Sequence, residues 1–76
     1  MRLLGSDELI NALIRDGFQP RGKSGGGSHR VYKKVTPEGT RNVVVVLAKK
    51  EIPIGPLRSI MRQAGLSEKQ LLDLLK

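Results

Sequence analysis

The sequence predicts an α+β domain in which one helix is followed by three strands and then by two further helices. Three observations predict this order. Apolar residues recur at helical spacing within residues 9–14, β-branched residues fill residues 42–48, and two later segments with helical spacing follow helix-start signals. A chain of 76 residues has room for a single domain, residues 1–76, with one hydrophobic core.

The first helix is expected from Ser6 to about Asp16. Its apolar residues share one face of a helix: Leu9, Ile10, Leu13 and Ile14. Ser6 is expected to be the N-cap, because its hydroxyl could accept a hydrogen bond from a backbone amide of the first turn. Gly17 follows the helix directly and is suited to the left-handed conformation that ends helices.

The next two strands are expected at residues 18–23 and 28–35. Pro20 cannot donate a hydrogen bond to a sheet, so the first of these strands is expected at an edge. The second strand alternates between two faces: His29, Val31, Lys33 and Val35 on one, and Arg30, Tyr32 and Lys34 on the other. Periodicity alone leaves open which face meets the solvent.

The third strand is expected at residues 42–48, after a turn at residues 36–40 that contains Pro37 and Gly39. Its β-branched side chains occupy both faces, which predicts the central or best-covered strand of the sheet. The three strands are expected to form an antiparallel sheet with helices packed on one face. Such a sheet leaves valines exposed on its other face, and a partner could cover them.

Two helices complete the predicted order, α-β-β-β-α-α. One is expected from Pro56 to about Ala64, since proline is tolerated in a first helical turn. Arg58 and Arg62 share a face of this helix that is separate from its apolar face. Ser67, with glutamine three residues later, forms a capping-box pattern that predicts the start of a last short helix.

The charge balance points to a polyanionic partner. Fourteen Lys and Arg residues against seven Asp and Glu residues give a net charge of +7, and the pI of about 10.4 is above the level expected of nucleic-acid-binding domains. Many small proteins of other kinds are also basic. The sequence has no cysteine, which excludes disulfides, thiolate metal sites and thiol nucleophiles. It has neither a membrane-spanning apolar run nor a signal peptide pattern, so a cytoplasmic location is expected.

His29 is the only histidine, and imidazole is the side chain that changes protonation near neutral pH. Gly25, Gly26 and Gly27 precede it, and glycines allow a backbone to approach a phosphate closely. The cations near His29 in the sequence are Lys23, Arg30, Lys33 and Lys34. This combination favours a phosphodiester substrate. A lone histidine in a strand is nevertheless more often a packing or hydrogen-bonding residue.

These residues could support RNA cleavage by transesterification, in which a base removes the proton of a ribose 2′-hydroxyl and the oxyanion attacks the adjacent phosphate. One histidine cannot be acid and base at once, so Tyr32, a lysine or water would supply the second proton transfer. Neither a metal nor a cofactor is expected, because one histidine and scattered acids do not form a ligand set. The glycines lack the spacing of a P-loop, and Ser24 and Ser28 lack a nucleophile elbow.

Several segments together match one family. They are Asp16-Gly17-Phe18 at the end of the first helix, Gly27-Ser28-His29 followed by Tyr32, the glycine-bearing turn before a hydrophobic strand, and Ile52-Pro53 with Gly55, Leu57, Arg58, Ile60 and Gln63-Ala64-Gly65-Leu66. In their order and spacing they resemble the HicA toxins, small RNA-cleaving members of bacterial and archaeal toxin–antitoxin pairs. The resemblance covers nearly the whole chain.

The resemblance implies a fold similar to a double-stranded RNA-binding domain. It also implies that His29 is the catalytic histidine of a metal-independent endoribonuclease that cleaves messenger RNA and arrests growth, and that a HicB-type antitoxin masks the site. The residues expected to bind RNA are Lys23, Ser28, Arg30, Lys33 and Lys34, with Gly27 and Tyr32 in possible support.

Two alternatives remain open. One is a non-catalytic, basic RNA-binding module in which His29 only forms hydrogen bonds, and the other is a structural protein that binds only another protein. The glycine run looks longer than the usual approach to the Gly-Ser-His triplet. Gly25 to Gly27 are therefore either a phosphate-binding segment or an inserted hinge.

Overall fold

The computed structural model of the chain describes residues 2–22 and 29–76. Its elements are, in order, α1 (Ser6–Arg15), β1 (Gln19–Pro20), β2 (His29–Thr36), β3 (Gly39–Val46), α2 (Ile54–Ala64) and α3 (Glu68–Leu74). The strands form one antiparallel sheet in the order β1-β2-β3. The predicted α+β class and the α-β-β-β-α-α order are confirmed. None of the described helices is long and apolar enough to span a bilayer.

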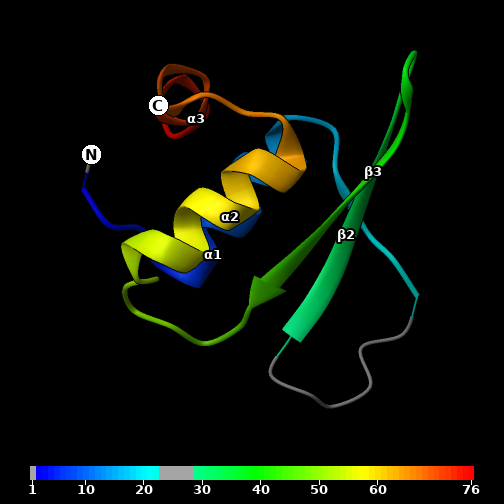
Figure 1. Cartoon of the computed structure of the whole chain (residues 1–76). Coiled ribbons are helices and arrows are strands. Elements are labelled where there is room, and N and C mark those ends of the chain that lie inside the picture. The colour runs from blue at the N-terminus through cyan, green and yellow to red at the C-terminus, as the bar shows by residue number, and fades with distance from the viewer. Residues whose placement is uncertain (1, 23–28) are drawn as a thin grey trace.

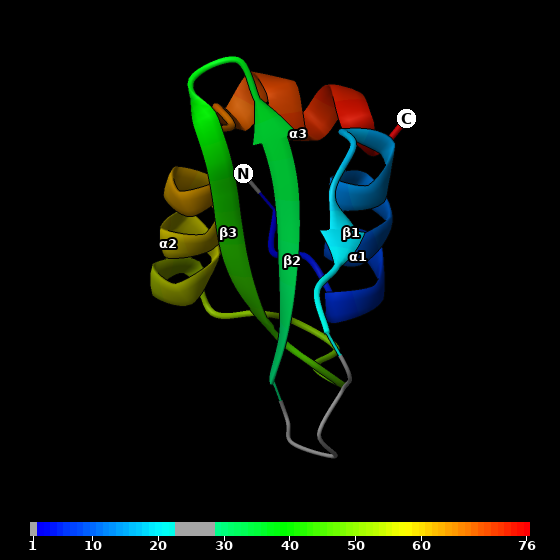
Figure 2. The same cartoon turned by 90° about the vertical axis from the view of Figure 1, so that its right-hand side faces the viewer.

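The domain has two layers. All three helices lie on one side of the sheet, whereas no described element covers the other side (Figure 1 and Figure 2). We call this uncovered side the open face. Tyr32 is buried and Val31 is not, so the alternation of β2 directs its even-numbered residues toward the helices. His29, Val31, Lys33 and Val35 therefore belong to the open face.

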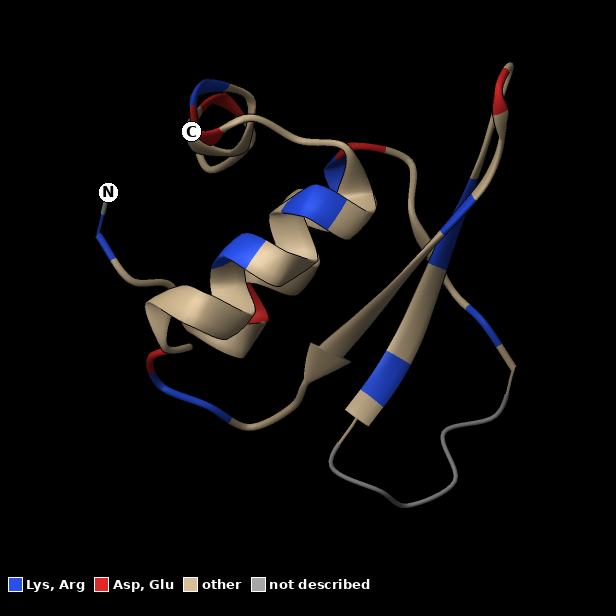
Figure 3. Ribbon diagram, in the orientation of Figure 1, with Lys and Arg blue, Asp and Glu red and all other residues tan. Residues whose placement is uncertain are grey.

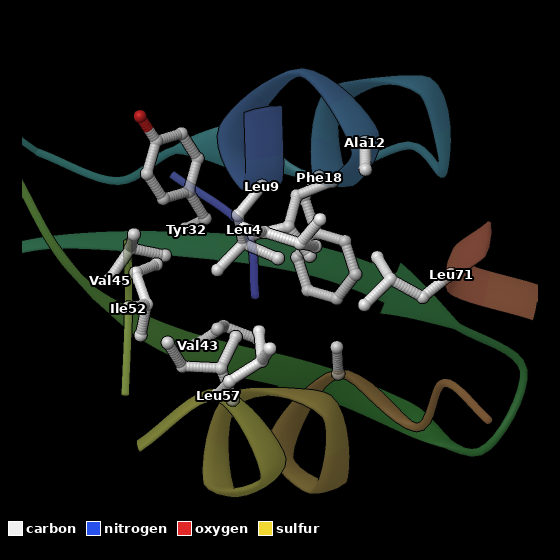
Figure 4. Close-up of a cluster of buried hydrophobic side chains, with 13 residues drawn as sticks. Leu4, Leu9, Ala12, Phe18, Tyr32, Val43, Val45, Ile52, Leu57 and Leu71 are labelled. Carbon is white, nitrogen blue, oxygen red and sulfur yellow. The ribbon is translucent and has the colours of Figure 1, made fainter. Parts of the chain in front are cut away.

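One hydrophobic core fills the space between the helices and the sheet (Figure 4). Every helix, and both of the longer strands, contribute fully or nearly buried side chains. The core residues are Leu4, Leu9, Ala12, Leu13, Phe18, Tyr32, Val43, Val45, Ile52, Leu57, Ile60, Ala64 and Leu71. Because α3 contributes Leu71, this short helix is part of the core layer and not an appendage. Arg15 of α1 holds its end by donating to the carbonyls of Leu74 and Lys76, each at 2.8 Å.

The predicted central position of the third strand is wrong, because β2 is the central strand and β3 lies at an edge. Val43 and Val45 of β3 are buried under the helices, but Val44 between them is 42% exposed. The valine run is thus buried on one face only, and its other face is left uncovered. The strand also begins earlier and ends earlier than predicted. Pro20 does lie on an edge strand, as predicted, but β1 contains only two residues.

The outer edge of β3 is partly occupied by a side chain of α2. Gln63 accepts a hydrogen bond from the Val44 amide through Oε1 at 3.2 Å, and its Nε2 donates to Ser59 Oγ at 3.4 Å. An unpaired edge amide is a site where a further strand can add. Gln63 satisfies this one within the domain.

Ser6 does not cap α1, which corrects the prediction. The N-cap is Gly5, and Ser6 is a buried residue of the first turn. Its hydroxyl donates to the Val46 carbonyl at 2.6 Å and accepts from the Lys49 amide at 3.0 Å. These tertiary hydrogen bonds link the start of α1 to the chain that leaves β3, and they hold the hydroxyl away from the helix amides.

Glu8 supplies the cap interaction at this helix end instead. Its carboxylate accepts from the Gly5 amide at 3.3 Å and from Arg2 Nη2 at 2.7 Å. The hydrogen bond from Arg2, followed by that from Gly5, lowers the pKa of the Glu8 carboxyl.

The predicted start is corrected for α2 and confirmed for α3. α2 begins at Ile54, two residues before Pro56, which is still within the first turn where a missing amide leaves no hydrogen bond unmade. The capping box of α3 is confirmed: Ser67 Oγ accepts from the Gln70 amide at 3.1 Å, and Gln70 Oε1 accepts from the Ser67 amide at 2.8 Å.

The bridge formed by Ser6 predicts a measurable contribution to stability. Replacing Ser6 with Ala removes the partner of a part-buried amide and a carbonyl, so we expect the free energy of unfolding in urea to fall by about 1–3 kcal/mol. Ser59→Ala is the matched control on the exposed side of α2, and we expect it to change stability by less than about 0.5 kcal/mol. Equal stability of the two variants would show that the Ser6 bridge contributes nothing.

Candidate functional site

His29 is the first residue of β2 and lies exposed on the open face, opposite Val46 of β3. The central strand of the sheet therefore positions its backbone. The segment before it, residues 23–28, lies outside the described residues, and so do the sites predicted at Lys23, Gly27 and Ser28 and the predicted phosphate contact of Gly25 to Gly27.

Valines alternate with polar residues along the open face beside His29. In the register of β2 and β3, Val31 lies opposite Val44, and Val35 opposite Thr40. Val35 is 74% exposed and Val44 is 42% exposed. Lys33 and Asn42 form the row of the sheet between these two valines. The open face thus combines one imidazole with two exposed valines and with polar residues between them.

The cations predicted to surround His29 are divided between the two faces of the sheet. Lys33 lies on the open face, between Gln19 of β1 and Asn42 of β3. It is four residues from His29, which separates their backbones by about 13 Å along the strand. Lys33 is therefore too far from His29 to contact the same group of a ligand, and is placed to contact a neighbouring group.

Lys34 and Arg30 face the helix layer. Lys34 Nζ lies 3.1 Å from Asp16 Oδ2 and 5.8 Å from the centre of the Phe18 ring, so its charge is engaged within the domain. Arg30 is half-buried, and its Nε is buried without a hydrogen-bond partner. Neither side chain shares the face of His29.

Tyr32 also belongs to the opposite face. It is 2% exposed and lies among the buried side chains in Figure 4. In this position its ring is a core residue of the central strand. Its place on the far side of the sheet from His29 does not support the predicted role of Tyr32 as a second proton-transfer group.

Arg21 is on the open face, and the sequence reasoning did not select it. Its amide donates to the Val31 carbonyl at 2.8 Å, and its Nη1 donates to Asn42 Oδ1 at 3.0 Å. The guanidinium thus reaches across β2 into the row that contains Lys33. Pro20 indicated that this segment lies at an edge of the sheet. The sequence pattern did not show how β1 pairs with β2, and this pairing is what places Arg21 on the open face.

The open face of the two longer strands has no acidic side chain to oppose these cations. Neither β2, HRVYKKVT, nor β3, GTRNVVVV, contains Asp or Glu. Within the described ranges, no group of three or more His, Cys, Asp and Glu side chains could hold a metal ion. The arrangement can place an imidazole and separated cations against an extended anion.

A family model described as the HicA toxin of bacterial toxin–antitoxin matches residues 6–66. The matched segment runs from the start of α1 to just beyond the end of α2 and includes the whole sheet. A comparison with curated proteins finds no match.

The two adjacent lysines of β2 allow a test of their different surroundings. Lys34→Gln removes the ion pair with Asp16 and the contact with Phe18, so we expect the free energy of unfolding to fall by about 1 kcal/mol. Lys33→Gln makes the same chemical change on the open face, and we expect a change below about 0.5 kcal/mol. Urea unfolding of both variants measures the difference. A greater loss for Lys33→Gln would contradict the assignment of faces.

Proposed function

The chain belongs to the HicA toxin family of bacterial toxin–antitoxin systems, since the match at residues 6–66 spans most of its 76 residues, and we propose that it cleaves messenger RNA with His29 as general acid or base. Membership of this family makes the chain a toxin whose partner is a cognate antitoxin. The catalytic step, its substrate and the role of each residue belong to the proposal.

One observation carries the proposal: His29 is exposed at the start of the central strand, on a face whose two longer strands have no acid. A histidine with a mainly structural role would be expected to lie among the helices with Tyr32. A position on the open face instead leaves the imidazole accessible to an extended polyanion. Lys33 and Arg21 on the same face would attract such a substrate.

The proposed reaction is an intramolecular transesterification. Neutral His29 takes the proton of a ribose 2′-hydroxyl, the 2′-oxygen forms a bond to the adjacent phosphorus, and the bond from phosphorus to the 5′-oxygen of the next nucleotide breaks. That 5′-oxygen takes up a proton. The products are a 2′,3′-cyclic phosphate and a 5′-hydroxyl. Because the substrate supplies its own nucleophile, the proposed reaction needs no metal, and DNA is not cleaved.

Two assignments of the second proton transfer fit this scheme. If His29 is the base, water or a lysine protonates the leaving oxygen; if imidazolium is the acid, another group removes the 2′-proton. We leave Tyr32 out of this step because it is buried on the other face. The backbone at Gly27 and the side chains of Ser28 and Lys23 are proposed to contact RNA near His29.

The cations take unequal parts in the proposal. Lys33, about 13 Å from His29 along the strand, would hold a neighbouring phosphate. Arg30 directly follows His29, and its Nε is buried without a hydrogen-bond partner. The other donors of its guanidinium are proposed to contact RNA at the end of the sheet. Lys34 is the weakest of the predicted RNA-binding residues, because its ammonium is paired with Asp16.

The antitoxin is proposed to cover the open face. Val35 and Val44 are exposed there, and burial of such side chains is a common source of protein–protein affinity. An antitoxin on this face would also cover His29 and exclude RNA. Since messenger RNA is the proposed substrate, we expect the protein to act in the cytoplasm, in a growth-arresting stress response.

A non-catalytic RNA-binding module is the second candidate. It is favoured by the wide separation of the cations from His29, which suits binding along a chain better than attack at one phosphate. Both candidates predict binding that weakens as salt rises. Only the first predicts new RNA ends.

Cleavage by a His29→Ala variant tests the assignment. We expect its rate on messenger RNA to fall at least about 100-fold, the usual contribution of a general acid or base, with an unchanged circular dichroism spectrum. Tyr32→Phe keeps the ring in the core and removes only the hydroxyl, so we expect it to cleave at a rate within about twofold of wild type.

The RNA ends distinguish the candidates further. Wild-type protein should produce 2′,3′-cyclic phosphate ends, which mass spectrometry detects. Full activity of folded His29→Ala would remove His29 from the mechanism. If the wild-type protein binds RNA at low salt but yields no fragments, the binding module is the better account.

A further inference from the structure

Three arginines form a second basic surface away from His29. Arg58 and Arg62 are exposed one helical turn apart on α2, and Arg41 is exposed on the edge strand β3. Arg41 Nη1 donates to the Gln63 carbonyl at 3.4 Å, so it lies against the last turn of the helix that carries the other two. We call these residues the arginine band. Figure 3 shows segments of Lys or Arg, in blue, on both α2 and β3.

The packing around Gly65 also keeps Arg41 at the end of α2. Gly65 has a φ of 71°, and a Cβ placed there would lie 2.7 Å from Arg41 Cζ. The glycine therefore ends the helix in the left-handed conformation and leaves space for the guanidinium. These contacts keep the Arg41 side chain beside α2.

Stability of the domain explains the arginine band only in part, because Arg41 donates to a carbonyl of the last turn of α2 and Arg62 lies in that turn, where a cation is favourable. The helix α2, IGPLRSIMRQA, contains no acid, and none of the three arginines forms an ion pair with a described residue. Two like charges one turn apart on a helix repel each other. The described part of the molecule thus bears an electrostatic cost that an external polyanion would remove.

The band is separate from the site at His29. Arg41 pairs with Lys34, whereas His29 pairs with Val46, so their rows of the sheet are about 16 Å apart along the strands. Arg41 lies beside the helix layer, while His29 belongs to the open face. An RNA with its reacting phosphate at His29 would have to extend past the end or edge of the sheet to reach the band.

The chemistry of the band favours a nucleic acid backbone over an acidic protein. Guanidinium groups bind phosphate oxygens with paired hydrogen bonds. The surface around Arg58 and Arg62 is also polar, because their exposed neighbours include Ser59 and Gln63. Stable protein interfaces usually contain buried apolar or aromatic anchors. On α2 the exposed large apolar residue is Ile54, in its first turn, whereas the open face has the exposed Val35 and Val44.

We propose that the arginine band holds the sugar-phosphate backbone of the RNA substrate at a site remote from His29. The inference rests on the proposed function, because it assumes that RNA is the substrate. Contacts to phosphate carry no base specificity, so the band would raise affinity for RNA of any sequence. It would affect KM and leave the chemical step at His29 unchanged.

The test compares two double variants that each remove two positive charges. Arg58→Gln/Arg62→Gln changes the band, and Lys50→Gln/Lys69→Gln changes two exposed lysines elsewhere. Each is made with His29 intact for cleavage and with His29→Ala for binding of a labelled single-stranded RNA by fluorescence anisotropy. We expect the band variant to bind at least about tenfold more weakly than the control, with a salt slope reduced by about 1–2. Its KM should rise with kcat within about twofold.

The outcomes separate a failure of the proposed function from a failure of the inference about the arginine band. If wild type neither cleaves nor binds RNA, the proposed function fails. If wild type cleaves RNA and the two double variants behave alike, the arginine band is not an RNA site and the inference is overturned. Loss of antitoxin binding with RNA binding intact would overturn it too, in favour of an acidic protein partner. Should the double variant unfold, Arg41→Gln against Lys69→Gln provides the same comparison.

Discussion

The alternation of β2 is the constraint on which the candidate site depends. Tyr32 is buried against the helices, and His29, three residues earlier, must then point to the opposite face. A shift of one residue in the pairing of this strand would expose Tyr32 and bury His29. The exposed position of the imidazole is therefore fixed by the burial of an aromatic ring that has no part in the proposed chemistry. Burial of Phe18, Leu9 and Leu13 in the same core makes that register costly to change.

The element order could be predicted because it follows from local pattern: the helical spacing before Asp16, the alternation after His29, and the capping box at Ser67. What could not be predicted depends on contacts between distant residues. The valines of residues 43–46 read as a doubly covered strand, yet only a three-dimensional arrangement decides that helices cover one face and nothing described covers the other. Ser6 has the side chain of an N-cap, but hydrogen bonds to Val46 and Lys49 outcompete the local one.

The same distinction applies to the site. His29 could be selected from its chemistry alone, because it is the single imidazole in the sequence. Its neighbours could not, since proximity in sequence placed Arg30 and Lys34 near it although strand alternation directs them to the other face. Arg21 reaches the open face through the pairing of β1 with β2, a register that no sequence periodicity encodes. Resemblance supplied the family, and the match at residues 6–66 establishes it.

Each edge of the sheet carries a feature that hinders the addition of another strand. At β1, Pro20 lacks an amide hydrogen, and the strand has only two residues. At β3, the amide of Val44 is already bonded to Gln63. Side-chain surfaces are the other way to meet a partner, and the described residues offer two of contrasting character: the open face with its exposed valines, and the arginine band on α2 and β3. Exposed valines suit a folded protein and guanidinium groups suit phosphates. Under the proposed function, RNA and antitoxin would therefore compete on the open face, at His29, Lys33 and Arg21, and not at the arginine band.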